Sequence, residues 1–233
     1  MTVTEPAVYP PIQPVGFEIY RDIHKGIRAD LFAATNSAGT LDPSDTIGRR
    51  AVADHVQRLG DFLIEHAEHE DAVILPVLHA ELPALGERIA SDHARIDGRI
   101  ETLRDPADAA KTADATEQRF RVHQLYIEIA SFTAAFLEHQ DFEERVVARE
   151  IEAKGGVETS MGLHGAIVGG LSPEEMVRSM SIMLPAMNVD DRAEMLGGMR
   201  ANAPAEVFNG IWNLAGSLLD SADVRALAGR LGL

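Results

Sequence analysis

The chain has 233 residues, no cysteine and a formal net charge of −16 at pH 7. The lack of cysteine excludes disulfides, thiolate nucleophiles, iron–sulfur clusters and thiolate-rich zinc sites, so any metal must be held by nitrogen and oxygen ligands. The negative charge, with no basic run interleaved with aromatic residues, excludes nucleic acid as an expected partner.

The hydrophobic pattern predicts an all-α fold. Aromatic residues make up only 5% of the chain, and no segment shows the Val/Ile/Thr-rich alternation of a half-buried strand. The N-terminus lacks a basic region followed by an apolar core, and no run of 18 apolar residues occurs. We therefore expect a cytoplasmic protein with no membrane partner.

The first half of the chain begins with a proline-rich arm, residues 1–14, which is expected to be extended. Apolar residues recurring at i+4 steps beside basic ones predict an amphipathic helix over 17–38. The Asp42-Pro43-Ser44-Asp45 cluster then offers N-cap chemistry for a long second helix that reaches about Leu78.

Prolines and glycines mark the next two helices. A third helix is predicted from Pro83 to about Leu103, because proline suits the first helical turn. A fourth is predicted to start after Pro106 and to stop at the Gly155-Gly156 pair, with first turns that are potentially irregular. Together the four helices predict an antiparallel, up-down four-helix bundle over residues 15–156.

Gly, Met and Pro become more frequent in residues 157–233, and the expected helices are shorter and separately capped. This pattern predicts a C-terminal helical extension packed on the bundle. Ser172-Pro173-Glu174-Glu175 forms a capping box with proline at the first helical position. The methionines of this segment are spaced as apolar packing contacts rather than as metal ligands: Met176, Met180, Met183, Met187, Met195 and Met199. A protein partner, if one exists, is expected to bind this extension.

An internal repeat carries the chemistry. Phe62-Leu63-Ile64-Glu65-His66-x-x-x-Glu70-Asp71 is echoed 73 residues later by Ala135-Phe136-Leu137-Glu138-His139-x-x-x-Glu143-Glu144. A second pair, His24-x-x-Ile27 and His93-x-x-Ile96, is offset by 69 residues. A helix pair thus appears twice, and two related halves would bring four motifs together.

The spacing within His-x-x-x-Glu explains why these residues are candidate metal ligands. The two side chains lie about 40° apart around a helix and one turn apart along it, so both project from one face. Apolar residues at core-like spacings flank the motifs: Phe62, Val73, Phe132, Phe136 and Val146. A single buried pair of this kind is more often a satisfied polar contact. Two pairs, each preceded by a helix with an inward histidine, favour metal ligation.

Across roughly residues 15–153 the chain resembles the hemerythrin-like, HHE cation-binding domains. The resemblance is carried by His66-x-x-x-Glu70-Asp71-x-x-Ile74-Leu75-Pro76 and by the order of His24, His93 and His139-x-x-x-Glu143. It implies a di-iron centre with an oxo or hydroxo bridge, bridging carboxylates Glu70 and Glu143, and four terminal histidines. Four imidazoles and two carboxylates with no thiolate suit iron or manganese, and zinc or copper less well if carboxylates bridge two ions. With the resemblance, iron is the expected metal, ahead of manganese or zinc.

The chain departs from the oxygen-carrying hemerythrins at two points. Those proteins have a fifth histidine one turn after the third-helix ligand, where this chain has Asp97, and their last carboxylate follows its histidine by five residues rather than four. Asp97 either binds metal, accepts a hydrogen bond from a bound water, or is solvated. Similarly, His69 either borders the site or lies at the surface, and Tyr20 either approaches the iron or packs with its hydroxyl hydrogen-bonded.

Two classes of function follow from the same centre. The first is a redox enzyme that reacts with O₂, peroxide or NO at a carboxylate-bridged iron pair, as a peroxidase, a catalase-like enzyme or an NO-handling oxidoreductase. The second is a non-catalytic module that binds O₂ or iron for sensing or storage. The small ligand is a diatomic molecule or a peroxide in either case.

Overall fold

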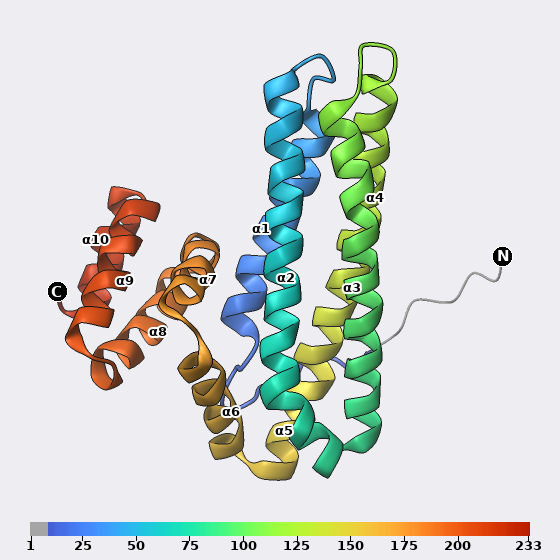
Figure 1. Ribbon diagram of the computed structural model, residues 1–233. Coiled ribbons are helices and arrows are strands. Elements are labelled where there is room, and N and C mark those ends of the chain that lie inside the picture. Colours follow the sequence, from blue (N-terminus) through green and yellow to red (C-terminus); the bar gives the residue numbers. More distant parts are fainter. Residues whose placement is uncertain (1–8) are drawn as a thin grey trace. The chain divides into compact units, whose positions relative to one another are not determined.

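The computed structural model describes residues 9–233, and within this range helices are the regular secondary structure, with no strand (Figure 1). The predicted arm, residues 1–14, lies partly outside the described residues. The elements are α1 (Arg21–Thr40), α2 (Thr46–Glu81), α3 (Pro83–Thr112), α4 (Gln118–Phe142), a π-helix η1 (Glu143–Val147), α5 (Ala148–Gly155), α6 (Val157–Gly170), α7 (Pro173–Ala186), α8 (Val189–Asn202), α9 (Ala205–Leu218) and α10 (Ser221–Leu231). The predicted all-α class is therefore confirmed.

Several helix ends follow local capping rules. The Asp45 carboxylate accepts hydrogen bonds from the backbone N–H groups of Ile47 and Gly48, at 3.0 and 2.9 Å, and so starts α2 within the predicted cluster. The predicted capping box at Ser172 is present at the start of α7. Gly156 ends α5 with a φ of 77°, a conformation that suits glycine.

One predicted boundary is wrong. Pro106 does not precede a new helix but lies inside α3, which continues to Thr112. The turns after this proline are held by tertiary contacts, because Ala107 and Ala110 are fully buried and Arg49 of α2 donates hydrogen bonds to the carbonyl groups that end the helix. This packing offsets the cost of the missing proline N–H.

The chain divides into two compact units. The first contains the described residues up to Tyr20 together with Leu31–Gly169, and the second contains Arg21–Asp30 together with Gly170–Leu233. In the first unit α2 packs against α3 and α3 against α4, and these long helices lie side by side in Figure 1. One of its hydrophobic clusters joins α2, α3, the π-helix and α5 to the segment before α1: Ile19, Tyr20, Ile74, Leu78, Ile89, Phe142, Val147, Ala148, Ile151 and Leu163.

The second unit has its own core, formed by α7, α8, α9 and α10. Its buried members are Met180, Leu184, Leu196, Phe208, Ile211, Ala215 and Leu227, with Met176, Met195 and Met199 packed against them. The predicted packing role of the methionines is therefore confirmed for these residues. Within the same unit, the first turns of α1 contact α8. Lys25 pairs with Asp191, and Arg21 Nη2 lies 3.1 Å from Glu194 Oε2.

No helix of residues 9–233 is both long enough and apolar enough to cross a membrane.

The Arg49 contact gives a stability prediction. Its Nη1 donates to the carbonyl oxygens of Ala110 and Ala113, both at 2.8 Å, and the side chain is buried. Arg49→Met removes the donor from carbonyl groups at the end of α3, and should lower the free energy of unfolding by about 1–3 kcal/mol in urea denaturation. The neighbouring Arg50 is exposed, so Arg50→Met should change the free energy of unfolding by less than about 0.5 kcal/mol. Equal effects would show that the contact is not stabilising.

Candidate metal centre

Helix α2 places His66 and Glu70 one turn apart on a face that also carries buried Leu63, Ala67 and Ile74. Nε2 of His66 lies 3.3 Å from Oε1 of Glu70. Glu70 is only 4% exposed. The i, i+4 spacing therefore puts an imidazole and a carboxylate together in the interior, as the sequence predicted.

Helix α4 and the π-helix repeat this arrangement. His139 Nε2 lies 3.3 Å from Oε1 of Glu143, and the exposed fractions of the two residues are 4% and 1%. Glu143 is the first residue of the π-helix, a wider turn of the kind that often marks a functional site. The two halves of the sequence repeat thus have the same local geometry.

His93 of α3 lies between the two carboxylates. Its Nε2 is 3.5 Å from Glu70 Oε2 and 3.8 Å from Glu143 Oε1. The other ring nitrogen, Nδ1, lies 2.6 Å from Oδ1 of Asp71, at hydrogen-bond distance. One edge of the imidazole therefore faces the two glutamates, and the other edge faces Asp71.

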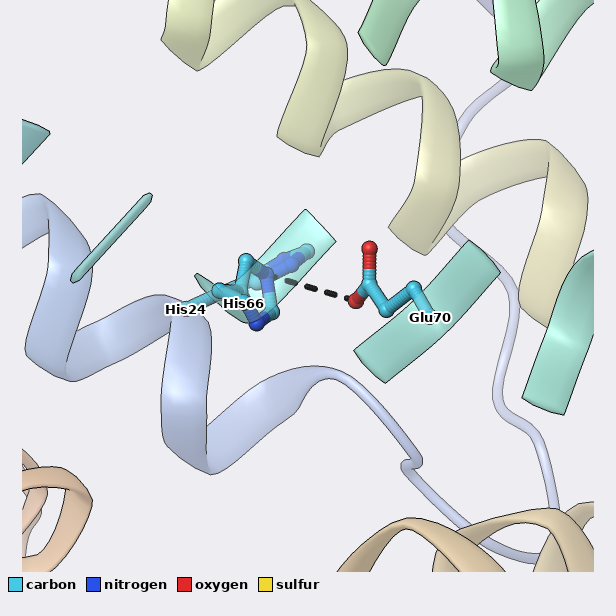
Figure 2. Close-up of side chains that lie close together, drawn as sticks. All are labelled: His24, His66 and Glu70. Atoms are coloured by element: carbon cyan, nitrogen blue, oxygen red, sulfur yellow. Dashed lines mark ion pairs between the residues drawn. The ribbon is translucent and has the colours of Figure 1, made fainter. Parts of the chain in front are cut away.

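Potential ligand atoms gather in two groups of three. In the first group, His24, His66 and Glu70 each offer an atom, and these atoms lie within 4.8 Å of one another. Figure 2 shows these three side chains, with the ion pair between His66 and Glu70 as a dashed line. The second group contains His93, His139 and Glu143 and meets the same distance criterion. The two groups contain the six residues that the sequence predicted as ligands; their binding of metal stays a prediction.

The electrostatics of the carboxylates reflect their burial. Burial raises the pKa of Glu70 well above its usual value, and the nearby charge of Glu143 raises it further. Burial lowers the pKa of His93, but its hydrogen bond to Asp71 and the nearby carboxylates of Glu143 and Glu70 outweigh that effect and raise it to about 10. The raised pKa of His93 favours its cationic form beside the two glutamates.

The residues predicted to border the site differ in their surroundings. Burial raises the pKa of Tyr20, and the charges of Glu143 and Glu70 raise it further, so its phenol lies within electrostatic range of both carboxylates. Asp97 is half-buried, and its Oδ1 has no hydrogen-bond partner among residues 9–233. His69 is half-buried, and neither it nor Asp97 belongs to either group of ligand atoms found among the described residues. The alternatives for these two side chains stay predictions.

Two polar residues that directly follow predicted ligands in the chain were not singled out from the sequence. Asp71 follows Glu70 and contacts His93, whereas from the sequence it was identified only as part of the repeated motif. Gln140 follows His139 and is fully buried, with no hydrogen-bond partner for its amide among the residues described. Polar residues directly beside predicted ligands were the available signal, but the partner of Asp71 lies on another helix and is not visible from local spacing.

The donor geometry fits metal cations. Two donors bound about 2.1 Å from one cation at angles of about 90–110° lie roughly 3.0–3.4 Å apart. The separations from Glu70 to His66 and from Glu143 to His139 are both 3.3 Å, within this range. In addition, the buried Glu70 Oε2 and His93 Nε2 lack hydrogen-bond partners in the described part of the chain. Buried polar atoms of this kind are expected where an ion binds.

Comparisons with known proteins agree with this geometry. The hemerythrin family model, described as the hemerythrin HHE cation binding domain, matches residues 15–151. This range contains all six predicted ligands. Searches of curated proteins and of solved structures gave no significant match.

The raised pKa of His93 predicts that cation binding releases a proton. Without a bound cation, His93 keeps its second ring proton near neutral pH because its pKa is raised to about 10, and this proton must leave when a cation binds the ring. Affinity should therefore rise with pH, by about tenfold per pH unit for each proton released, until pH exceeds the pKa of His93. Calorimetric titration in two buffers of different ionisation enthalpy measures the release. Binding heats that do not depend on the buffer would contradict the prediction.

Proposed function

Because the chain belongs to the hemerythrin family of HHE cation-binding domains, we propose that it binds a carboxylate-bridged pair of iron ions. The proposed ligands are His24, His66, Glu70, His93, His139 and Glu143. In this proposal α1, α2, α3 and α4 form an antiparallel, up-down four-helix bundle around the pair. In the same proposal, the protein is a redox enzyme that acts on O₂, peroxide or NO.

The position of Glu70 is the observation that carries the proposal. Its Oε1 lies 3.3 Å from His66 of one ligand group, and its Oε2 lies 3.5 Å from His93 of the other. A carboxylate whose two oxygens face histidines from different groups is suited to bridge two cations. Four imidazoles, two carboxylates and no cysteine in the chain suit a carboxylate-bridged pair of iron or manganese ions. The family match makes iron the metal that we propose.

A bound iron pair would supply redox chemistry toward O₂, peroxide or NO. The chain's own side chains would control access and protons. The Phe136 ring lies 5.9 Å from the His139 ring between centroids, and both residues are buried, which limits entry of water. Because its pKa is raised, the Tyr20 hydroxyl keeps its proton and can donate a hydrogen bond near Glu70 and Glu143.

Asp97 bears on the kind of reaction. Its unpartnered Oδ1 lies one helical turn beyond His93, where oxygen-carrying hemerythrins have a histidine. In the proposal this oxygen accepts a hydrogen bond from a bound small ligand, which favours turnover over simple oxygen carriage. A non-catalytic module that senses or stores O₂ or iron is the second candidate, since the same six ligands would serve it.

Neutralising the proposed bridge tests the centre itself. Glu70→Gln should abolish the spectroscopic signature of a coupled iron pair and reduce the iron retained per chain, because an amide cannot bridge two cations as a carboxylate does. The measurements are Mössbauer spectroscopy and elemental analysis after anaerobic Fe(II) loading. Glu68→Gln is a matched control, because Glu68 lies on the same helix and is exposed. Equal losses in the two variants, or no retained iron in the wild-type chain, would contradict the proposal.

Mixing experiments separate the two functions. When the reduced, iron-loaded protein is mixed with H₂O₂ in a stopped-flow instrument, an enzyme should consume peroxide over many turnovers. A binding module should instead show an optical change with O₂ that reverses when O₂ is removed. Peroxide consumption that stops after a single equivalent would contradict the enzymatic proposal.

A further inference from the structure

Asp71 makes a contact for which the proposed ligand set does not account. It follows Glu70 on α2, so it points about 100° away from Glu70 around the helix. Its Oδ1 lies 2.6 Å from Nδ1 of His93 on α3, which is a short hydrogen bond to a charged acceptor. The Asp71 side chain is 42% exposed, whereas that of His93 is only 3% exposed.

The hydrogen bond determines which ring nitrogen of His93 faces the ligand groups. A neutral imidazole carries one ring proton, and an anionic acceptor at Nδ1 holds that proton there. The lone pair is then on Nε2, the nitrogen that lies 3.5 Å from Glu70 and 3.8 Å from Glu143. Both the tautomer and the ring orientation are therefore those required for a cation to bind between His93 and the glutamates.

We propose that Asp71 is a positioning residue that orients His93 and strengthens it as an electron donor to the cation. This inference rests on the proposed function and deepens it, because it concerns how one ligand is tuned. A hydrogen bond from a ligating histidine to a carboxylate raises the basicity of the ring. A more basic ligand stabilises the more oxidised metal, so Asp71 lowers the reduction potential of the centre.

Asp71 differs from the other carboxylates around His93. Asp97 lies one turn along α3 from His93, but its Oδ1 has no hydrogen-bond partner among residues 9–233. An ion pair between two exposed side chains contributes little to stability. The Asp71 contact is different, because its partner is the buried His93 ring that faces both glutamates. The sequence repeat adds support, because Glu144 occupies in the second half the position that Asp71 occupies in the first.

The test compares Asp71→Asn with Asp71→Glu and with the control Glu68→Gln on the exposed face of α2. In the metal-free protein, NMR should show a downfield, slowly exchanging Nδ1–H resonance of His93. Asp71→Asn should shift this resonance upfield and speed its exchange, since an amide is a weaker acceptor. Asp71→Glu should retain it at least in part, and Glu68→Gln should leave it unchanged.

Iron loading adds two readouts. Asp71→Asn should weaken Fe(II) binding by about 10- to 100-fold and raise the midpoint potential, while Glu68→Gln changes neither. An unchanged His93 resonance in Asp71→Asn, or unchanged affinity and potential, would overturn the proposed role of Asp71. If the wild-type chain binds no iron but the resonance responds as expected, the proposed function fails while the orientation of His93 by Asp71 stands.

Discussion

Two buried carboxylates facing one set of imidazoles constrain the rest of this structure. Glu70 and Glu143 are 4% and 1% exposed, and the charge of Glu143 raises the pKa of Glu70. Burying an unpaired charge costs on the order of several kcal/mol. The surrounding histidines offset part of this cost. A fold that needed only a packed core would place Leu or Ile here, and the two buried acids instead fit a metal site.

Much of this arrangement could be predicted because it depends on local periodicity. The i, i+4 spacing of His66 with Glu70 and of His139 with Glu143 decides which face of a helix they share, and the structure places each pair at 3.3 Å. The N-cap at Asp45 is equally local. Features that depend on contacts between helices were not predictable. Pro106 signalled a boundary by its chemistry, but packing of the turns beyond it extends α3 to Thr112.

The π-helix is a second feature that periodicity could not reveal. Regular α-helical spacing placed Val146 on the core face; in the structure Val146 packs against the core but stays half-buried, and its neighbour Val147 is completely buried. A π-turn takes more residues than an α-turn, so positions beyond Glu143 face different directions from those that a regular helix would give them. The wide turn thus leaves His139 and Glu143 in ordinary helical spacing while it resets the register of α5.

The distribution of methionine has a consequence for chemical durability. Packing by thioethers is concentrated in the core of the second unit, and between Met1 and Met161 the sequence contains neither methionine nor cysteine. Sulfur side chains are the ones that peroxide oxidises most readily, and a core methionine turned into a sulfoxide disrupts its packing. The helices α2 to α5, with five of the six proposed ligands, therefore offer no sulfur to such damage. A chain that generates or consumes oxidants at these helices would keep its scaffold intact over many cycles.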